Sequence, residues 1–223
     1  DGSGQTLSPI TISGASVTLT GFTLNNGTGT ALVDDDGGSV TIGGGLAALN
    51  TPNLEINACA IANNTAQYGG GMAILAAGSL SITDTWVFYN EAETSGGGVY
   101  LDESDSVLQG VDITENNATY GGGLALVNQT TTIDDLDLSD NEATQDGGGL
   151  YVQALEYNTE ITNSEVFRNE VGNTGGGLFL SAGRFITTDV DWGAASDTNS
   201  PNDIGGQVSI TELSGNLDIS AGN

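Results

Sequence analysis

The stretch that decides the fold is residues 69–101, which read GGGMAILAAGSLSITDTWVFYNEAETSGGGVYL. Three glycines open it, three apolar segments follow, Asn90 ends the last of them, and a new glycine triplet then restarts the order. Apolar residues such as Met72 and Ile74 alternate with other residues, and this period of two indicates strands with one buried face. The stretch is therefore one unit of a β-strand repeat.

The repeat continues in both directions along the chain. Glycine triplets begin at residues 43, 69, 96, 121, 147 and 175, and a degenerate Gly205-Gly206 pair follows, so the spacings are 26, 27, 25, 26, 28 and 30 residues. Each unit holds about three short strands: one after the glycines, a weaker middle pair, and one that ends before an Asn. Neither a helical period nor a hairpin signal recurs. These features predict an all-β parallel β-helix with about 26 residues per coil.

Equivalent positions of successive coils should form columns about 4.8 Å apart along the long axis. We expect glycines where the chain turns into the first strand, because glycine tolerates positive φ and close backbone approach. We expect the recurring Asn residues to adopt a left-handed turn conformation and to bond to one another or to the turn backbone, with a ligand-binding role as the alternative. These are Asn64, Asn90, Asn116, Asn141 and Asn169. The predicted core residues are Leu46, Met72, Ile74, Val99, Leu101, Leu124, Leu126, Leu150, Val152, Leu178 and Leu180.

Two segments of the repeat, Val87-Phe88-Tyr89-Asn90 and Val166-Phe167-Arg168-Asn169, together with the glycine triplets resemble the repeats of the polymorphic outer membrane protein family. That family's motifs are Gly-Gly-Ala with an aliphatic residue and Phe-x-x-Asn. Here the third position is Gly, and Val, Ile or Leu stands three residues before the Asn. The resemblance spans about residues 43–180. It implies a right-handed β-helix exported to a bacterial surface, often adhesive and similar to an autotransporter passenger, and it carries over no catalytic residue.

The pattern indicates one β-helix domain over residues 1–223. Residues 1–42 are expected to form irregular opening coils with an acidic loop, residues 43–192 the regular coils, and residues 193–223 an acidic loop and a partial terminal coil. Cys59 is the only cysteine and lies in an apolar run, which favours a buried thiol. No stretch is apolar enough throughout to indicate a transmembrane segment.

The charge balance excludes whole classes of partner. Acids outnumber bases 29 to 2, there is no His, and the formal net charge is −27. Nucleic acids are excluded because their binding depends on Lys and Arg, and direct insertion in a membrane is not expected. The partners that remain are a surface glycan, a protein receptor, or another copy of the chain stacked end to end. We expect an extracellular or outer cell surface location.

The acidic residues follow the repeat. One outward position carries Asp112, Asp137, Glu165 and Asp191 in four consecutive coils, and a second carries Glu91, Glu142 and Glu170, which predicts an acidic wall on one face. The wall is either a solvated surface or a binding site for a divalent cation, calcium being the only candidate cofactor. Asp197, Asn199 and Asp203 are a separate calcium candidate in the terminal loop, because calcium prefers several closely spaced oxygen ligands.

Catalysis is the main functional alternative. A polysaccharide lyase often uses Arg or Lys as its base, and only Arg168 and Arg184 are present. A hydrolase needs convergent carboxylates, for which the candidates are Asp112, Asp134, Asp135, Asp137 and Asp140. Thr residues scatter over different repeat positions, which disfavours an ice-binding face. The sequence therefore favours a non-enzymatic, secreted or surface-displayed structural or adhesive module, with a carbohydrate-active enzyme as the alternative.

Overall fold

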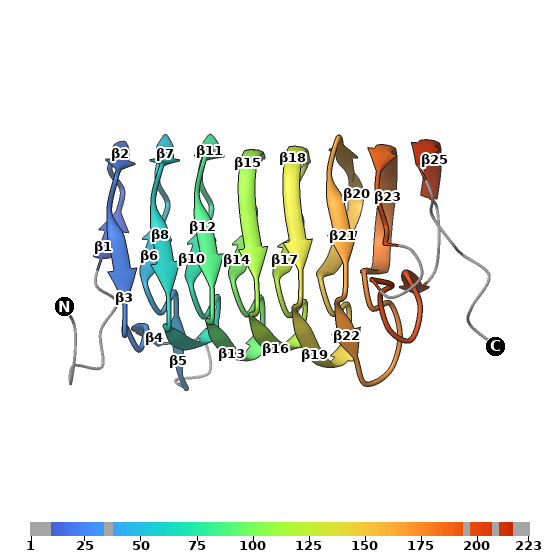
Figure 1. The fold of residues 1–223 in the computed structure, drawn as a ribbon. Coiled ribbons are helices and arrows are strands. Elements are labelled where there is room, and N and C mark those ends of the chain that lie inside the picture. The colour runs from blue at the N-terminus through green and yellow to red at the C-terminus, as the bar shows by residue number, and fades with distance from the viewer. Residues whose placement is uncertain (1–9, 34–37, 194–196, 207–209, 216–223) are drawn as a thin grey trace.

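The computed structural model describes residues 10–33, 38–193, 197–206 and 210–215. All secondary-structure elements in these residues are β-strands. Coils stack side by side into an elongated solenoid (Figure 1). All strand pairings between coils are parallel, so the predicted all-β parallel β-helix is confirmed. The structure adds a fourth short strand to each regular coil, which directly follows the Asn and belongs to a separate sheet.

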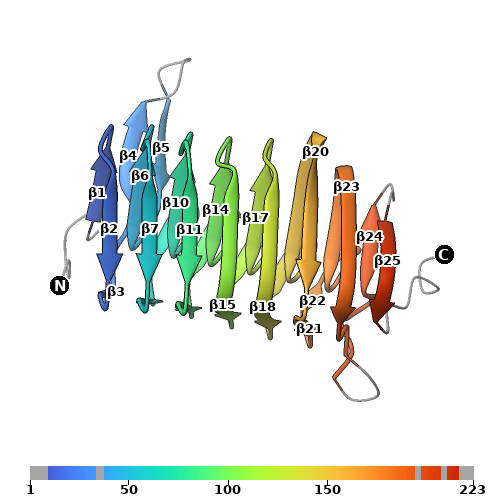
Figure 2. The same cartoon turned by 90° about the horizontal axis from the view of Figure 1, so that it is seen from above.

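The strands fall into four columns, and Figure 2 shows the first behind the second. The first column contains β1 (Ile10–Ser13), β6 (Leu46–Leu49), β10 (Met72–Leu75), β14 (Val99–Asp102), β17 (Leu124–Val127), β20 (Leu150–Thr162), β23 (Leu178–Val190) and β24 (Ile204–Gly206). The second contains β2 (Val17–Thr20), β7 (Leu54–Asn57), β11 (Leu80–Thr83), β15 (Ser106–Thr114), β18 (Thr131–Ser139), the later parts of β20 and β23, and β25 (Ile210–Gly215).

The third column contains β3 (Thr23–Asn25), β8 (Ala60–Ala62), β12 (Trp86–Phe88), the ends of β15 and β18, and β21 (Glu165–Phe167). The fourth column is the seven-stranded sheet of β4 (Thr30–Val33), β5 (Ser39–Ile42), β9 (Thr65–Tyr68), β13 (Glu91–Ser95), β16 (Asn117–Tyr120), β19 (Glu142–Asp146) and β22 (Glu170–Val171).

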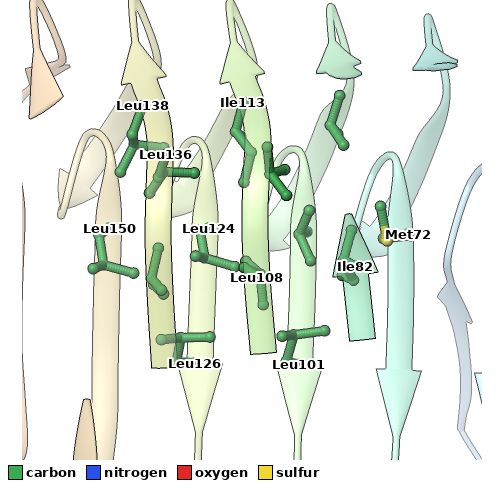
Figure 3. Packing of buried hydrophobic residues seen from close by; sticks show 14 of the residues in the cluster. Met72, Ile82, Leu101, Leu108, Ile113, Leu124, Leu126, Leu136, Leu138 and Leu150 are labelled. Atoms are coloured by element: carbon green, nitrogen blue, oxygen red, sulfur yellow. The ribbon is translucent and has the colours of Figure 1, made fainter. Parts of the chain in front are cut away.

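The core fills the interior of the solenoid. Met72 lies in register between Leu46 and Val99, and Ile74 between Ala48 and Leu101, so like residues stack along the axis. All of the predicted core residues are buried. Figure 3 shows five of them, Met72, Leu101, Leu124, Leu126 and Leu150, packed between the strands. Full burial of one such side chain contributes about 1.5–3 kcal/mol. Cys59 joins the same core, as predicted.

The glycine column has the predicted conformation. The first glycine of each triplet has a positive φ, for example 64° at Gly69 and 67° at Gly96. The second and third glycines are required by space, because a Cβ at Gly97 would collide with the carbonyl oxygens of Gly122 and Asn117 in the next coil. The triplet is therefore a turn at which successive backbones nearly touch.

The Asn column forms a continuous buried ladder. The Nδ2 of Asn90 donates to Oδ1 of Asn116 at 3.0 Å, and the backbone N–H of Asn90 donates to the same oxygen at 2.9 Å. Asn90 Nδ2 also donates to the carbonyl of Ile61 in the preceding coil at 2.9 Å. The expected hydrogen bonds are confirmed, but the expected conformation is wrong. The left-handed residue is the one before each Asn, such as Tyr89 with φ 54°.

The opening region differs from the expected series of coils. One coil of β1, β2 and β3 forms as predicted, and β4 then pairs with β5 as an antiparallel hairpin. Leu32 and Ile42 of this hairpin pack against Ala47 and Ala73 on the outer side of the first column. The hairpin is favoured because it covers apolar residues that would otherwise face solvent. Residues 34–37 of the acidic loop predicted at 34–38 lie outside the described residues.

The terminal region continues the Asn ladder through the predicted acidic loop, which contributes Asn199. Asn199 accepts from Asn169 Nδ2 at 3.0 Å and donates to the carbonyls of Val166 at 2.9 Å and Trp192 at 3.0 Å. Asn199 lies seven residues after Trp192, whereas Asn169 lies two after Phe167, and this insertion hides the motif in the sequence. The predicted terminal coil is present as β24 and β25, and residues 216–223 lie outside the described part.

Candidate functional site

The first acidic column is formed as predicted. Parallel pairing sets Asp112 opposite Asp137, Asp137 opposite Glu165, and Glu165 opposite Asp191. The column is positioned by the third strand, where the residue before each buried apolar residue faces outward. Adjacent carboxylates are thus carried by backbones about 4.8 Å apart. Trp86 precedes Asp112 in the column and its side chain is 54% exposed.

The second acidic column lies on a different sheet. Glu91, Glu142 and Glu170 belong to the seven-stranded sheet, with Asn117 between Glu91 and Glu142. The Asn turn separates this sheet from the first acidic column, so the two columns do not make one wall. The expectation of a single acidic face is corrected to two separate acidic columns. The fourth strand, which the sequence analysis did not predict, is the reason.

A groove of about 410 Å³ runs beside the first acidic column. Its lining includes Asp84, Asp112, Asp135, Asp137 and Glu165, and we call it the acidic groove. Burial raises the pKa of Asp112, and the charges of Asp137 and Asp135 raise it further, although a hydrogen bond from the Trp86 side chain opposes them. The groove therefore brings Asp112, whose pKa is raised, together with four other acidic side chains.

The remaining hydrolase candidates do not join this lining. Asp134 accepts hydrogen bonds at 2.8 Å from Thr162 Oγ1 and Asn163 Nδ2, which lower its pKa. Asp140 accepts from Nε of Arg168 at 2.7 Å and from Nη2 at 2.6 Å. Three of the five predicted carboxylates therefore share the acidic groove, namely Asp112, Asp135 and Asp137.

Neither arginine is placed as a base for the acidic groove. Arg168 pairs with Asp140, approaches Asp197 at 3.6 Å, and lies 4.4 Å from the centre of the Phe167 ring. The hydrogen bonds and charge of Asp140 raise the pKa of Arg168 further, so the guanidinium stays protonated. Arg184 is exposed on β23, in register with Asn158, and does not line the groove.

The predicted calcium loop separates into three roles. Asn199 belongs to the buried ladder, Asp203 Oδ1 accepts a hydrogen bond from Asn199 Nδ2 at 3.0 Å, and Asp197 lies near Arg168. Within residues 10–33, 38–193, 197–206 and 210–215, no three His, Cys, Asp or Glu side chains converge to hold a metal ion. In this loop Asn199 extends the Asn ladder and Asp203 accepts its amide hydrogen.

A second groove, of about 240 Å³, is lined by tyrosines from alternate coils. Tyr68 and Tyr100 have ring centres 5.3 Å apart, and Tyr120 and Tyr151 have ring centres 5.5 Å apart. Sequence analysis missed this aromatic groove. The available signal was that Tyr100, Tyr151 and Phe179 all stand two residues after a glycine triplet. The tyrosines that end β9 and β16 complete the groove only because those strands fold against the first column.

The comparison with protein families decides the wider grouping. A family model described as the right-handed β-helix region matches residues 8–190. The chain belongs to the right-handed β-helix family. The handedness implied by the sequence resemblance is thereby confirmed, whereas the narrower relation to polymorphic outer membrane proteins stays a prediction. Neither the curated proteins nor the solved structures gave a match.

Membership of the right-handed β-helix family leaves the activity open, because the fold occurs in both enzymes and non-enzymes. In the described part of the chain, no helix has the length and apolar character needed to cross a bilayer. The two grooves and the two acidic columns are therefore the candidate functional surfaces.

Proposed function

We propose that this right-handed β-helix is a non-enzymatic structural or adhesive module, secreted or displayed on the outer cell surface. The observation that carries the proposal is the columnar arrangement of the outer surface. Side chains of one kind recur in register from coil to coil, as Asp112, Asp137 and Glu165 do. A surface of repeated equivalent groups suits contact at many points with an extended partner, whereas catalysis needs one convergent set.

The acidic columns supply the second part of the proposal. Repeated carboxylates favour solubility and a diffuse layer of cations, and the same layer permits contact with anionic surfaces. Cation binding is proposed as unselective screening along the columns. Calcium is the divalent ion to test, because its ligands are carboxylate oxygens.

One observation favours a carbohydrate-active enzyme as the second candidate. Glycoside hydrolysis uses one carboxylic acid with a raised pKa and one carboxylate that stays ionised. The acidic groove contains Asp112 with its raised pKa beside Asp137. Substitution of Asp112 or Asp137 therefore tests whether the protein is an enzyme.

One experiment separates the two candidates. The purified chain is incubated with a panel of neutral and acidic polysaccharides, and both retention on the polymer and release of new chain ends are measured. We expect retention without cleavage. Cleavage that is abolished by Asp112→Ala or Asp137→Ala would establish the enzyme, and absence of retention on the polysaccharides and on a panel of extracellular proteins would remove the adhesive role. The location is tested by finding the chain outside intact cells of its source.

A further inference from the structure

The aromatic groove lies between two columns of strands. Tyr100 of β14 and Tyr151 of β20 stand on the outer side of the first column, one residue after Val99 and Leu150, which face the core. Tyr68 ends β9 and Tyr120 ends β16 in the seven-stranded sheet. Because these strands belong to different coils, the groove follows the long axis of the solenoid.

The tyrosine rings leave part of their faces available. Tyr151 and Phe179 are stacked with an angle of 8° between their planes, so they cover one face of each other. The Tyr68–Tyr100 and Tyr120–Tyr151 pairs are tilted by 58° and 56°. A tilted pair keeps ring surface open toward the groove, and each of these tyrosines is only half-buried.

The lining of the aromatic groove is uncharged although the whole chain has a net charge of −27. Thr94, Ser95 and Gln153 add hydroxyl and amide groups to the tyrosines. The Tyr100 hydroxyl donates to Asp102 Oδ2 at 3.4 Å, and burial raises the pKa of Tyr100, which keeps the phenol neutral. A polyanion would be repelled by the charge of the surrounding molecule, and a polycation would find no carboxylate in the lining itself, where the nearby Asp102 already accepts a hydrogen bond from the Tyr100 hydroxyl. The complementary ligand is therefore neutral, polar and able to pack on aromatic rings.

We propose that the aromatic groove binds a linear, neutral oligosaccharide lying along the solenoid axis. A sugar ring carries C–H faces that pack on aromatic rings and hydroxyls that exchange hydrogen bonds with Ser, Thr, Gln and Tyr. Tyr100 and Tyr151 are in register two coils apart, with Ala125 between them, so their backbones lie about 9.6 Å apart, close to the length of two sugar units in an extended chain. The inference rests on the proposed adhesive function and gives it a site and a ligand class.

The experiment measures binding of cellotetraose, xylotetraose and chitotetraose by calorimetry, with tetragalacturonate as the anionic control. We expect at least one neutral tetrasaccharide to bind and tetragalacturonate not to bind. Tyr100→Ala and Tyr151→Ala should each weaken binding about tenfold, which corresponds to about 1.4 kcal/mol and is within the range for one lost aromatic contact. Tyr100→Phe keeps the ring and should retain most of the affinity. Tyr89→Ala is the matched control, because Tyr89 is an exposed tyrosine outside the groove and its loss should change the affinity less than twofold.

Several results would overturn the inference. The first is that no neutral tetrasaccharide binds. The second is that the Tyr100→Ala and Tyr151→Ala variants bind as tightly as the wild-type protein. The third is that the groove binds only apolar peptides, and the neutral tetrasaccharides do not compete with them. Thermal unfolding of each variant checks that it folds, and Tyr151→Leu replaces Tyr151→Ala if the latter does not. Retention on polysaccharides that the tetrasaccharides fail to compete away would reject this site and keep the adhesive function. Cleavage blocked by Asp112→Ala would reject the adhesive function. The affinities of the tyrosine variants for the tetrasaccharides would then still decide whether the aromatic groove binds them.

Discussion

Single asparagines illustrate how one residue type holds the coils together. Each ladder Asn uses its Oδ1 to accept two hydrogen bonds and its Nδ2 to donate to neighbouring carbonyls, all in the buried turn. A buried polar group that loses its partner costs about 1–3 kcal/mol. The ladder is thus a source of stability only while every member is present.

Asn116→Ala should therefore destabilise the protein strongly. It leaves the Asn90 amide and the carbonyls of Val87 and Thr114 without their partner, so a loss of about 2–4 kcal/mol is expected. That corresponds to a melting temperature roughly 5–12 °C lower. Thermal unfolding followed by circular dichroism measures it. Asn117→Ala, at the next residue and only half-buried, is the control and should shift the melting temperature little.

Asp112 should make stability fall as pH rises. Its folded pKa is raised above the unfolded value, so between these two values the folded state binds more protons, and the penalty is complete above the folded pKa. Asp112→Asn removes the charge, and we expect a higher melting temperature than wild type at neutral pH. The advantage should vanish as pH falls through the folded pKa of Asp112.

Asp134→Asn is the control of opposite sign. Hydrogen bonds lower the folded pKa of Asp134, so its contribution is present above the unfolded pKa and is lost as pH falls through the folded value. This variant should melt below wild type at neutral pH. Melting curves from acidic to neutral pH for both variants test the pair, and shifts of equal sign at neutral pH would contradict it.

Whole elements depend on the glycine turns that join the fourth column to the first. The turn brings the second glycine of one coil against carbonyl oxygens of the next, so only hydrogen fits there. The strands β13 and β14 are thereby held in register on both sides of the turn. The close approach at the turn therefore fixes where β13 ends and where β14 begins.

Gly97→Ala should disrupt the stacking of two coils. Its Cβ would overlap the Gly122 and Asn117 carbonyl oxygens, which cannot move without breaking strand pairing, so we expect a loss above about 3 kcal/mol or failure to fold. Gly14→Ala is the control, since no atom lies within 4 Å of its Cβ position. That variant carries only the cost of a positive φ, about 1–2 kcal/mol. Denaturant unfolding of both proteins gives the comparison.

The stability of the whole molecule is affected by repulsion between like charges that stack in columns. Two unit charges about 4.8 Å apart repel by roughly 1 kcal/mol in bulk water, and the columns repeat this contact from coil to coil. At 1 M salt the Debye length falls to about 3 Å, which removes most of the repulsion between exposed groups.

Sodium chloride should therefore raise the melting temperature between low salt and 1 M, because it screens the columns. Asp137→Asn, at the middle of the first acidic column, should flatten this dependence. Glu160→Gln is the control, because its register neighbours are the uncharged Thr132 and Ile186. Calcium and magnesium at equal ionic strength should act alike, and a melting temperature that does not respond to salt would contradict the argument.

The sequence by itself determined the coil. Glycine triplets, period-two apolar residues and recurring Asn predicted the parallel β-helix, its core and the four-residue acidic column, because each of these depends on local spacing repeated at about 26 residues. A repeat converts sequence position into spatial position directly, since every coil stacks only on its neighbours.

Tertiary structure alone decided what lies between columns. Tyr68 and Tyr100 meet because the unpredicted fourth strand folds back against the first column, and Asn199 joins the ladder although an insertion hides its motif. The same strand divides the acidic residues between two sheets. These outcomes depend on how far the chain bends at each turn and on which loops bulge outward. Such bends are set by packing between elements, so no local pattern in the sequence records them.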